Sequence, residues 1–285
     1  MSPAPGADSS DFRVGFAGLR STGDWAPPGW VDVVVEGPDA GSYLQGQLSQ
    51  DVAALAVGGT AWSLLLEPSG KLGSWLHVRR LAAERFVLEV DPATVDAVLA
   101  RLNRFKLRTD ATIALTGADL GSTDPSAVTG GAQPEGGAPL DGASRAEDEA
   151  ARIEAGVPRA GAEVSADVIP AELGGWLIDR SVSFTKGCYT GQELVARIDS
   201  RGGNVPRHLR GLLVAGETVP PVGAEIVVDG LVVGSITSAA HSARLAAPVA
   251  LGFVKRTVEP PTAAVVTWDG GSAPAEIRVL PLHSS

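Results

Sequence analysis

The sequence predicts an α+β protein that ends in a small antiparallel β-barrel. Strand-like and helix-like segments alternate over residues 30–116, whereas residues 206–285 contain only short β-type runs separated by glycine and proline. Between these two regions, residues 117–144 consist mainly of Gly, Ala, Pro, Ser and acidic residues. The 35 glycines and 20 prolines of the 285-residue chain favour turns and short strands over long helices.

An N-terminal α+β domain is expected at residues 30–116, after a flexible N-terminus at residues 1–29. Its second helix has Asp91 as a cap and Pro92 at the first helical position. A turn at Pro68-Ser69-Gly70 joins two of its strands. In chain order we expect a strand, a helix opened by Pro38, three strands, a helix and a strand, in the segments WVDVVVEG, PDAGSYLQGQLSQDV, TAWSLLLEPSGKLGSWLHVRRL (two strands), RFVLEV, DPATVDAVLARLNRF and ATIAL.

The remaining chain divides into three parts. Residues 117–144 have too little apolar surface to offset the entropy of ordering, so we expect a flexible acidic insertion. Residues 145–205 form a middle segment, in which EDEAARIEAGVPR and GQELVARI are helix-like and WLIDRSVSF is β-like. Residues 206–285 are the predicted barrel, where Asp229-Gly230 between apolar runs indicates a hairpin.

Charge and composition narrow the possible partners. The net charge of −10 and the pI near 4.9 argue against stable nucleic-acid binding. Two segments, Lys71–Arg108 and Arg180–Arg210, each hold four more bases than acids, and would either attract an anionic ligand or form solvated faces. No apolar run could span a bilayer, and the N-terminus does not resemble a secretory signal. Because a single cysteine fits a reducing compartment, we expect a cytoplasmic protein without membrane contacts.

The segment FTKGCYTGQELVAR, residues 184–197, contains the only cysteine of the chain, Cys188. Thr190 and Glu193 have the spacing of a capping box, which predicts a helix N-cap at Thr190. Cys188 would then lie two residues before the cap, beside the positive end of the helix dipole, with Lys186 two residues away. Both features favour thiolate over thiol.

Other interpretations of this cysteine also follow from the residues. Free cysteines are often small, buried and inert side chains. A cysteine protease would need a histidine base, but His77, His208, His241 and His283 have no diagnostic spacing to Cys188. No group of His and Cys has the spacing of metal ligands, and the glycine-rich stretches match neither a phosphate-binding loop nor a dinucleotide-binding fingerprint. A reactive and an inert thiol both remain open on local grounds.

The motif KGCYTGQELVAR resembles the signature of the YgfZ-type folate-binding proteins, which are related to the glycine-cleavage aminomethyltransferase (T-protein). Weaker resemblances follow in the family's order along the chain, in DAGSYLQGQLSQDV, LNRFKLRTDATI, RIEAGVPRAGAEV, VIPAELGG, VGSITS and ALGFVKR. They cover most of the sequence except its N-terminal end and the acidic insertion. The motif residues around Cys188 are Lys186, Gly187, Tyr189, Gly191, Gln192 and Glu193.

This resemblance implies a T-protein-like fold, in which interleaved N-terminal and middle α+β domains and a C-terminal antiparallel β-barrel surround a central hole. It also implies that tetrahydrofolate, or a one-carbon-substituted folate, binds near the middle. By position, Glu172 in VIPAELGG matches a carboxylate that contacts the pterin ring, and Arg197 would face the glutamate tail of folate. A carboxylate can accept two hydrogen bonds from an amino-pyrimidine edge. The other interpretation of Glu172 is a surface residue near a helix start.

The resemblance further implies an accessory protein for the assembly or repair of iron–sulfur proteins, with transient contacts to clients or assembly factors. Cys188 could attack a disulfide, accept a persulfide or transiently ligate a cluster, but one cysteine could not hold a cluster alone. The alternatives are a folate-dependent tRNA-modifying enzyme and a true aminomethyltransferase. The latter is disfavoured because Gly73 and Ser74 stand where the T-protein carries two aspartates.

Overall fold

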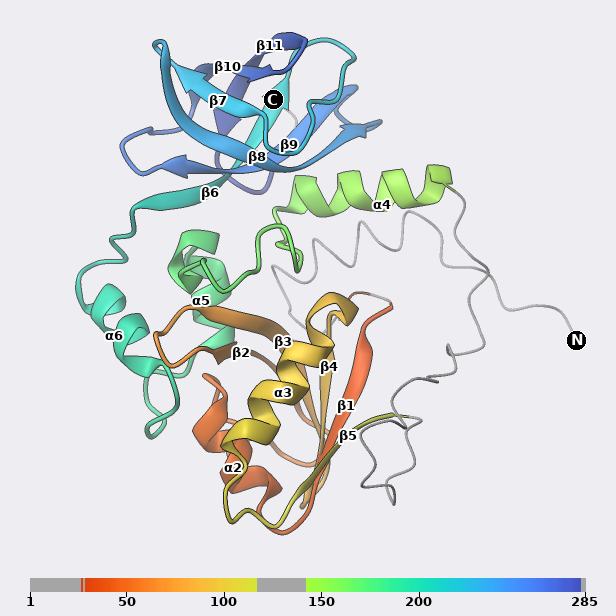
Figure 1. Cartoon of the computed structure of the whole chain (residues 1–285), viewed down its shortest axis with the longest axis vertical. Coiled ribbons are helices and arrows are strands. Elements are labelled where there is room, and N and C mark those ends of the chain that lie inside the picture. Colours follow the sequence, from red (N-terminus) through yellow and green to blue (C-terminus); the bar gives the residue numbers. More distant parts are fainter. Residues whose placement is uncertain (1–26, 28, 117–141, 283–285) are drawn as a thin grey trace, which may run out of the picture.

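The computed structural model describes residues 27, 29–116 and 142–282. Most of the expected flexible N-terminus and acidic insertion lies outside these residues, but residues 142–144 already belong to a helix. Three bodies follow one another along the long axis of the molecule, namely the N-terminal sheet, the middle segment and the barrel (Figure 1). The predicted α+β content and C-terminal antiparallel barrel are confirmed.

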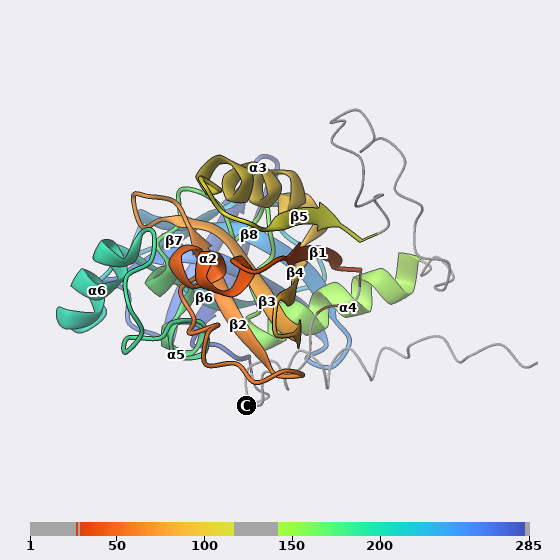
Figure 2. The same ribbon diagram turned by 90° about the horizontal axis from the view of Figure 1, so that it is seen from below.

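The N-terminal unit is a five-stranded antiparallel sheet with the strand order β2-β3-β4-β1-β5. Helices α2 (Ala40–Gln47) and α3 (Val95–Phe105) cover one face (Figures 1 and 2). The predicted cap residue Asp91 accepts a hydrogen bond from the Ala93 N–H, but it caps the 3-10 turn η1 (Pro92–Thr94), and the N-cap of α3 itself is Thr94. The strands are β1 (Val31–Glu36), β2 (Thr60–Leu66), β3 (Leu72–Ala82), β4 (Arg85–Val90) and β5 (Thr112–Leu115).

Both faces of this sheet are buried near its centre. Because side chains alternate along a strand, Leu76 and Leu88 pack beneath Leu44 of α2, while Trp62 and Trp75 point to the opposite face. The two indole rings stack with their centroids 4.2 Å apart. Their face of the sheet belongs to the same apolar cluster as the middle segment and part of the barrel. The indole face therefore joins the N-terminal unit to the rest of the molecule.

Six antiparallel strands form the closed C-terminal barrel in the order β10-β11-β6-β9-β8-β7. Asp229 and Gly230, with φ of 51° and 76°, form the predicted hairpin turn between β7 and β8. Buried aliphatic side chains such as Ile226, Val266 and Ile277 fill the interior. The strands are β6 (Arg207–Val214), β7 (Glu225–Val228), β8 (Leu231–Ser242), β9 (Ala247–Lys255), β10 (Thr262–Trp268) and β11 (Gly271–Arg278).

The middle segment consists of short helices between the sheet and the barrel (Figure 1). Helix α4 (Gly142–Ala155) packs against β8 and β9 of the barrel, and α5 (Gly175–Ser181) packs against β2 of the sheet. The 3-10 turn η3 (Pro170–Leu173) precedes α5 and contacts β6. Helix α6 (Gln192–Ser200) follows the cysteine motif and confirms the helix predicted for GQELVARI.

The strand expected in WLIDRSVSF is wrong, because this segment begins with α5. The helix places Leu177 and Ser181, which are four residues apart, on one fully buried face. Trp75 of β3 donates its indole N–H to the Ser181 hydroxyl at 3.1 Å. Packing against the sheet therefore overrides the β-like local pattern of this short segment.

Candidate functional site

Residues 184–191 of the cysteine motif form a loop between α5 and α6 that crosses the C-terminal end of α2. The side chain of Cys188 is exposed, so the interpretation as a buried side chain is wrong, and the reactivity of the thiol stays a prediction. Gly187 is also exposed, whereas Lys186 and Tyr189 are buried, with 8% and 7% of their surface accessible. The loop thus presents its thiol outward and holds the flanking side chains inward.

Lys186 makes three hydrogen bonds to backbone carbonyls rather than facing the thiol. Its ammonium donates to the oxygens of Gln45, Leu48 and Gln50 at 2.6, 2.7 and 2.9 Å. An ammonium has three donors, so all of them are used. Burial lowers the pKa of Lys186 to about 8, and the negative charge of Asp51 opposes this shift. The expectation that Lys186 favours the thiolate directly finds no support in these contacts.

The predicted capping box at Thr190 is wrong. Helix α6 begins after Gly191, which has a φ of 82°, and no side chain caps it. The Thr190 N–H instead donates to the Gly46 carbonyl of α2 at 3.1 Å, and Glu193 is exposed in the first turn of α6. Glycine starts the helix here because it adopts this left-handed backbone readily and because a Cβ atom at this position would lie 2.6 Å from the Glu67 carbonyl oxygen.

Two further motif residues hold the loop in place. Tyr189 lies in the apolar cluster that contains both indoles of the sheet, and burial raises its pKa to about 12. Gln192 accepts a hydrogen bond through Oε1 from the Tyr189 N–H at 3.4 Å. Both residues therefore fix the backbone on the C-terminal side of Cys188.

Glu172 lies in η3 and is 2% exposed, so the interpretation as a surface residue is wrong. Its Oε1 accepts a hydrogen bond from Arg207 Nε at 3.2 Å, and its Oε2 accepts one from the Ile169 N–H at 3.2 Å. The carboxylate retains further lone pairs, because each oxygen can accept two hydrogen bonds. A pterin edge would have to approach Glu172 beside these two partners.

A cavity of about 300 Å³ lies between η3, α5, α6 and β6, and Glu172 itself is not among the residues that line it. Pro170 and Ala171, which precede Glu172, form part of its wall. His208 and Arg210 also line it. Burial and the charge of Arg210 lower the pKa of His208, and burial lowers the pKa of Arg210. The cavity thus combines an apolar wall with a neutral imidazole, a partly desolvated guanidinium and the carboxylates of Asp179 and Asp199.

His208 and Arg210 are cavity residues that no sequence motif indicated. Their spacing of two residues in β6 is the available signal, since it places both side chains on one face of the strand. Arg197 has an exposed side chain on α6, while its neighbours Val195 and Ile198 are buried and line the cavity. The structure therefore brings the segments around Glu172 and Arg197 together at one cavity.

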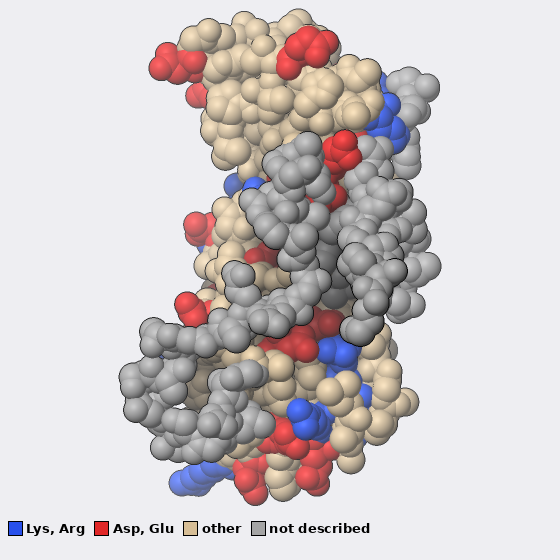
Figure 3. All heavy atoms as spheres, turned by 90° about the vertical axis from the view of Figure 1, so that its right-hand side faces the viewer, with Lys and Arg blue, Asp and Glu red and all other residues tan. Residues whose placement is uncertain are grey.

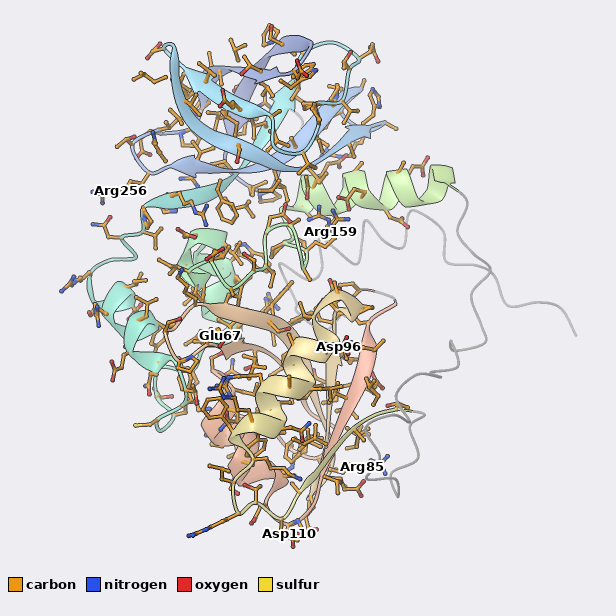
Figure 4. The ribbon with its side chains drawn as sticks, in the orientation of Figure 1. Glu67, Arg85, Asp96, Asp110, Arg159 and Arg256 are labelled. Atoms are coloured by element: carbon orange, nitrogen blue, oxygen red, sulfur yellow. The ribbon has the colours of Figure 1, made fainter. Side chains whose placement is uncertain are left out.

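The positions that lack the two acids lie in β3. Ser74 is buried, and its hydroxyl is 3.2 Å from that of Thr94. A Cβ atom at Gly73 would lie 3.2 Å from Oε1 of Glu67. Figure 4 labels Glu67 at the end of β2, near α6. Sequence reasoning missed this carboxylate, because only the β2–β3 hairpin brings it opposite position 73.

Among residues 27, 29–116 and 142–282, no group of three or more His, Cys, Asp and Glu side chains could hold a metal ion. In the same part of the chain, no helix is both long and apolar enough to cross a membrane. On the face shown in Figure 3, the basic side chains of the described residues are dispersed among acidic ones.

Known proteins share this architecture. Residues 207–283 match the glycine cleavage T-protein C-terminal barrel domain. The crystal structure of the glycine cleavage system aminomethyltransferase T from Bartonella henselae superposes with a TM-score of 0.67 at 19% identity, over 88% of this chain and 83% of that one. The fold is thus that of the aminomethyltransferases, as the sequence resemblance implied.

Sequence relatives define the family more closely. An uncharacterized protein of Haemophilus influenzae is 32% identical over 60% of this chain and 67% of its own length. The tRNA-modifying protein YgfZ of Edwardsiella ictaluri is 32% identical over 61% and 66%, respectively. The match to the aminomethyltransferase of Streptomyces avermitilis is 36% identical but spans only 36% of that protein. The chain belongs to the YgfZ-type family of aminomethyltransferase-like proteins.

Proposed function

We propose that the protein is a tetrahydrofolate-binding accessory factor for the assembly or repair of iron–sulfur proteins, and that Cys188 is its functional thiol. The observation that carries this proposal is the exposed Cys188 on a loop whose flanking residues are anchored to α2. Such a thiol is accessible to a protein partner while its backbone stays in one place. A single cysteine also fits work in the reducing cytoplasm, through transient contacts with client proteins.

Folate, in this proposal, occupies the cavity beside Glu172. A volume of about 300 Å³ is at the lower end for ligand pockets, so the pterin ring would fill it and the rest of the ligand would extend outward. The Glu172 carboxylate offers acceptors for the amino-pyrimidine edge. Arg210 and the exposed Arg197 offer positive charge for the glutamate carboxylates.

Replacing Cys188 with alanine tests the role of the thiol. Because the side chain is exposed, we expect the variant to fold with unchanged stability but to lose complementation of a deletion strain, with iron–sulfur enzyme activity as the readout. Thr185→Ala, at another exposed residue of the same loop, is the matched control and should complement fully. Full rescue by Cys188→Ala would rule out a functional thiol.

Replacing Glu172 with glutamine tests the folate site. The variant keeps the shape of the side chain but loses the charge, so we expect tetrahydrofolate to bind roughly tenfold more weakly in calorimetry. Glu193→Gln, at an exposed residue of α6, should bind like the wild type. Absence of binding to the wild type would reject the folate proposal, and equal binding by Glu172→Gln would reject this place for the pterin.

A second candidate is a folate-dependent tRNA-modifying role, which the name of the Edwardsiella relative favours. The net charge of −10 and the pI near 4.9 argue for an indirect role without stable RNA binding. Mass spectrometry of tRNA nucleosides from the deletion strain separates the candidates. A tRNA modification that is lost in the deletion strain, and that the protein restores while iron–sulfur enzyme activities stay low, would favour the tRNA role. A true aminomethyltransferase stays disfavoured, since neither Gly73 nor Ser74 carries a charge, although Glu67 lies beside position 73.

A further inference from the structure

We infer that Lys186 is a positioning residue, whose ammonium fixes the loop that displays Cys188 by binding three carbonyls at the C-terminal end of α2. This inference rests on the proposed function, because it assigns a purpose to the loop that holds the functional thiol. It concerns the place of the thiol and involves no chemical step.

The three acceptors explain why a lysine is suited to this position. Gln45 lies in the last turn of α2, where carbonyls lack partners within the helix, and Leu48 and Gln50 follow the helix. The Gln50 carbonyl also accepts a hydrogen bond from the Val52 N–H at 3.0 Å. A cation also interacts favourably with the negative end of the helix dipole. The compact ammonium can direct three N–H bonds to carbonyls that converge on one point, whereas the planar fork of arginine cannot.

The loop is tied down on both sides of the thiol. Before Cys188, the Ser183 N–H donates to the Ser49 carbonyl at 3.0 Å, in addition to the three bonds from Lys186. After it, the Thr190 N–H donates to the Gly46 carbonyl at 3.1 Å. Cys188 is thus midway between two anchors, each two residues away, and both anchors attach to the region around the end of α2.

Because Lys186 is buried, its role is to hold the loop rather than to add charge to the surface. Taking an ammonium out of water is unfavourable unless hydrogen bonds compensate for it, and here backbone carbonyls supply all of them. A partner that must reach one thiol benefits from a fixed loop. The conformational entropy of ordering that loop is then not lost when the partner binds. The geometry therefore assigns two separate roles. Lys186 holds the loop that carries the thiol, and Cys188 contacts the partner.

A nitroxide spin label tests this directly, since the full-length chain offers one cysteine and needs no other substitution. In the wild type, we expect electron paramagnetic resonance of the label on Cys188 to show restricted nanosecond motion. In Lys186→Met, the mobile fraction of the spectrum should rise roughly twofold or more, as for a released loop. Lys106→Met is the matched control, because Lys106 also donates to one backbone carbonyl, that of Ala111, near the end of α3.

A role of Lys186 in global stability alone would not change label motion in the folded protein. An identical spectrum for wild type and Lys186→Met at temperatures where both are folded overturns the inference. If Lys186→Met does not fold, Lys186→Arg is measured instead. A raised mobile fraction in Lys186→Arg would support the inference, and an unchanged spectrum would refute it. Complementation is measured in parallel. Full rescue by Cys188→Ala would remove the proposed function while leaving the spectral result to decide the role of Lys186.

Discussion

Both tyrosines of the chain are buried, one in α2 and the other in the cysteine motif. Tyr43 is 8% exposed and donates its hydroxyl to the Leu102 carbonyl at 2.5 Å, while Tyr189 is 7% exposed. Burial raises the pKa of each to about 12, against an ordinary value of 10.0, with the charge of Arg101 opposing the shift for Tyr43. A neutral phenol is therefore favoured in the folded state.

This shift predicts a loss of stability at alkaline pH. Between about pH 10 and 12 the unfolded chain releases phenolic protons that the folded chain keeps, so the free energy of unfolding must fall as pH rises. Urea unfolding across this range measures the slope, and phenolate absorbance of the native protein locates the ionisation. Tyr43→Phe and Tyr189→Phe should each reduce the slope. Phenolate absorbance that develops fully near pH 10 in the folded protein would contradict the prediction.

Single residues also show where the sequence sufficed and where it did not. The sequence indicated the importance of Lys186 and Gly191 from the motif itself, but it assigned the lysine to the thiol and the helix start to Thr190. The true partners, carbonyls at Gln45 to Gln50, lie more than a hundred residues away in the chain. Local spacing cannot reveal such contacts, because they form only when α2 and the motif meet in the fold.

At the scale of elements, the contact between the β2–β3 turn and the start of α6 depends on two glycines. Gly70 and Gly191 both have a φ of 82°. A Cβ atom on Gly191 would lie 2.6 Å from the Glu67 carbonyl oxygen, and one on Gly70 would lie 2.3 Å from Leu194 Cβ. Neither turn can accept a side chain, so the two backbones pack directly against each other.

We expect Gly191→Ala to lower the free energy of unfolding by about 2–4 kcal/mol, since a left-handed alanine and an overpacked contact each cost about 1–2 kcal/mol. Gly202→Ala is the matched control, because Gly202 has a φ of 72° but nothing within 4 Å of its added Cβ atom. Only the backbone strain should appear there, about 1–2 kcal/mol. Equal losses for both variants in urea unfolding would show that the contact with the turn adds nothing.

The type of an element, helix or strand, was predictable where the hydrophobic periodicity was strong. It was less predictable where tertiary contacts determine the type. The N-terminal strands, the α3 helix and the Asp229-Gly230 hairpin followed from alternation, caps and turn residues. The helix α5 did not, because its seven residues are too few to show a period and its buried face is defined by Trp75 of another element. The cavity beside Glu172 was equally hidden, since four elements build it.

At the scale of the whole molecule, a buried carboxylate joins the middle segment to the barrel. Glu163 has no exposed surface. Its Oε1 accepts hydrogen bonds from Thr237 at 2.6 Å and Ser238 at 2.7 Å, both in β8 of the barrel. Its Oε2 accepts hydrogen bonds from the Arg159 N–H at 3.0 Å and from Arg152 of α4 at 3.3 Å. One side chain thus connects α4, the turn after it and the barrel.

We expect Glu163→Gln to destabilise the protein by about 3 kcal/mol or more, because the variant leaves a buried Arg152 with less compensating charge and replaces one acceptor oxygen with an amide donor that faces other donors. For a chain of this size that loss corresponds to a melting temperature lower by roughly 6–12 °C. Calorimetry provides the measurement, and Glu225→Gln, at an exposed residue of β7, is the control that should melt like the wild type. If the network holds the barrel in place, the melting transition of Glu163→Gln should also be broader than that of the wild type, or split, as the barrel and the remaining chain unfold less cooperatively. An unchanged melting temperature and an unchanged transition shape would show that the barrel is held by the apolar cluster alone.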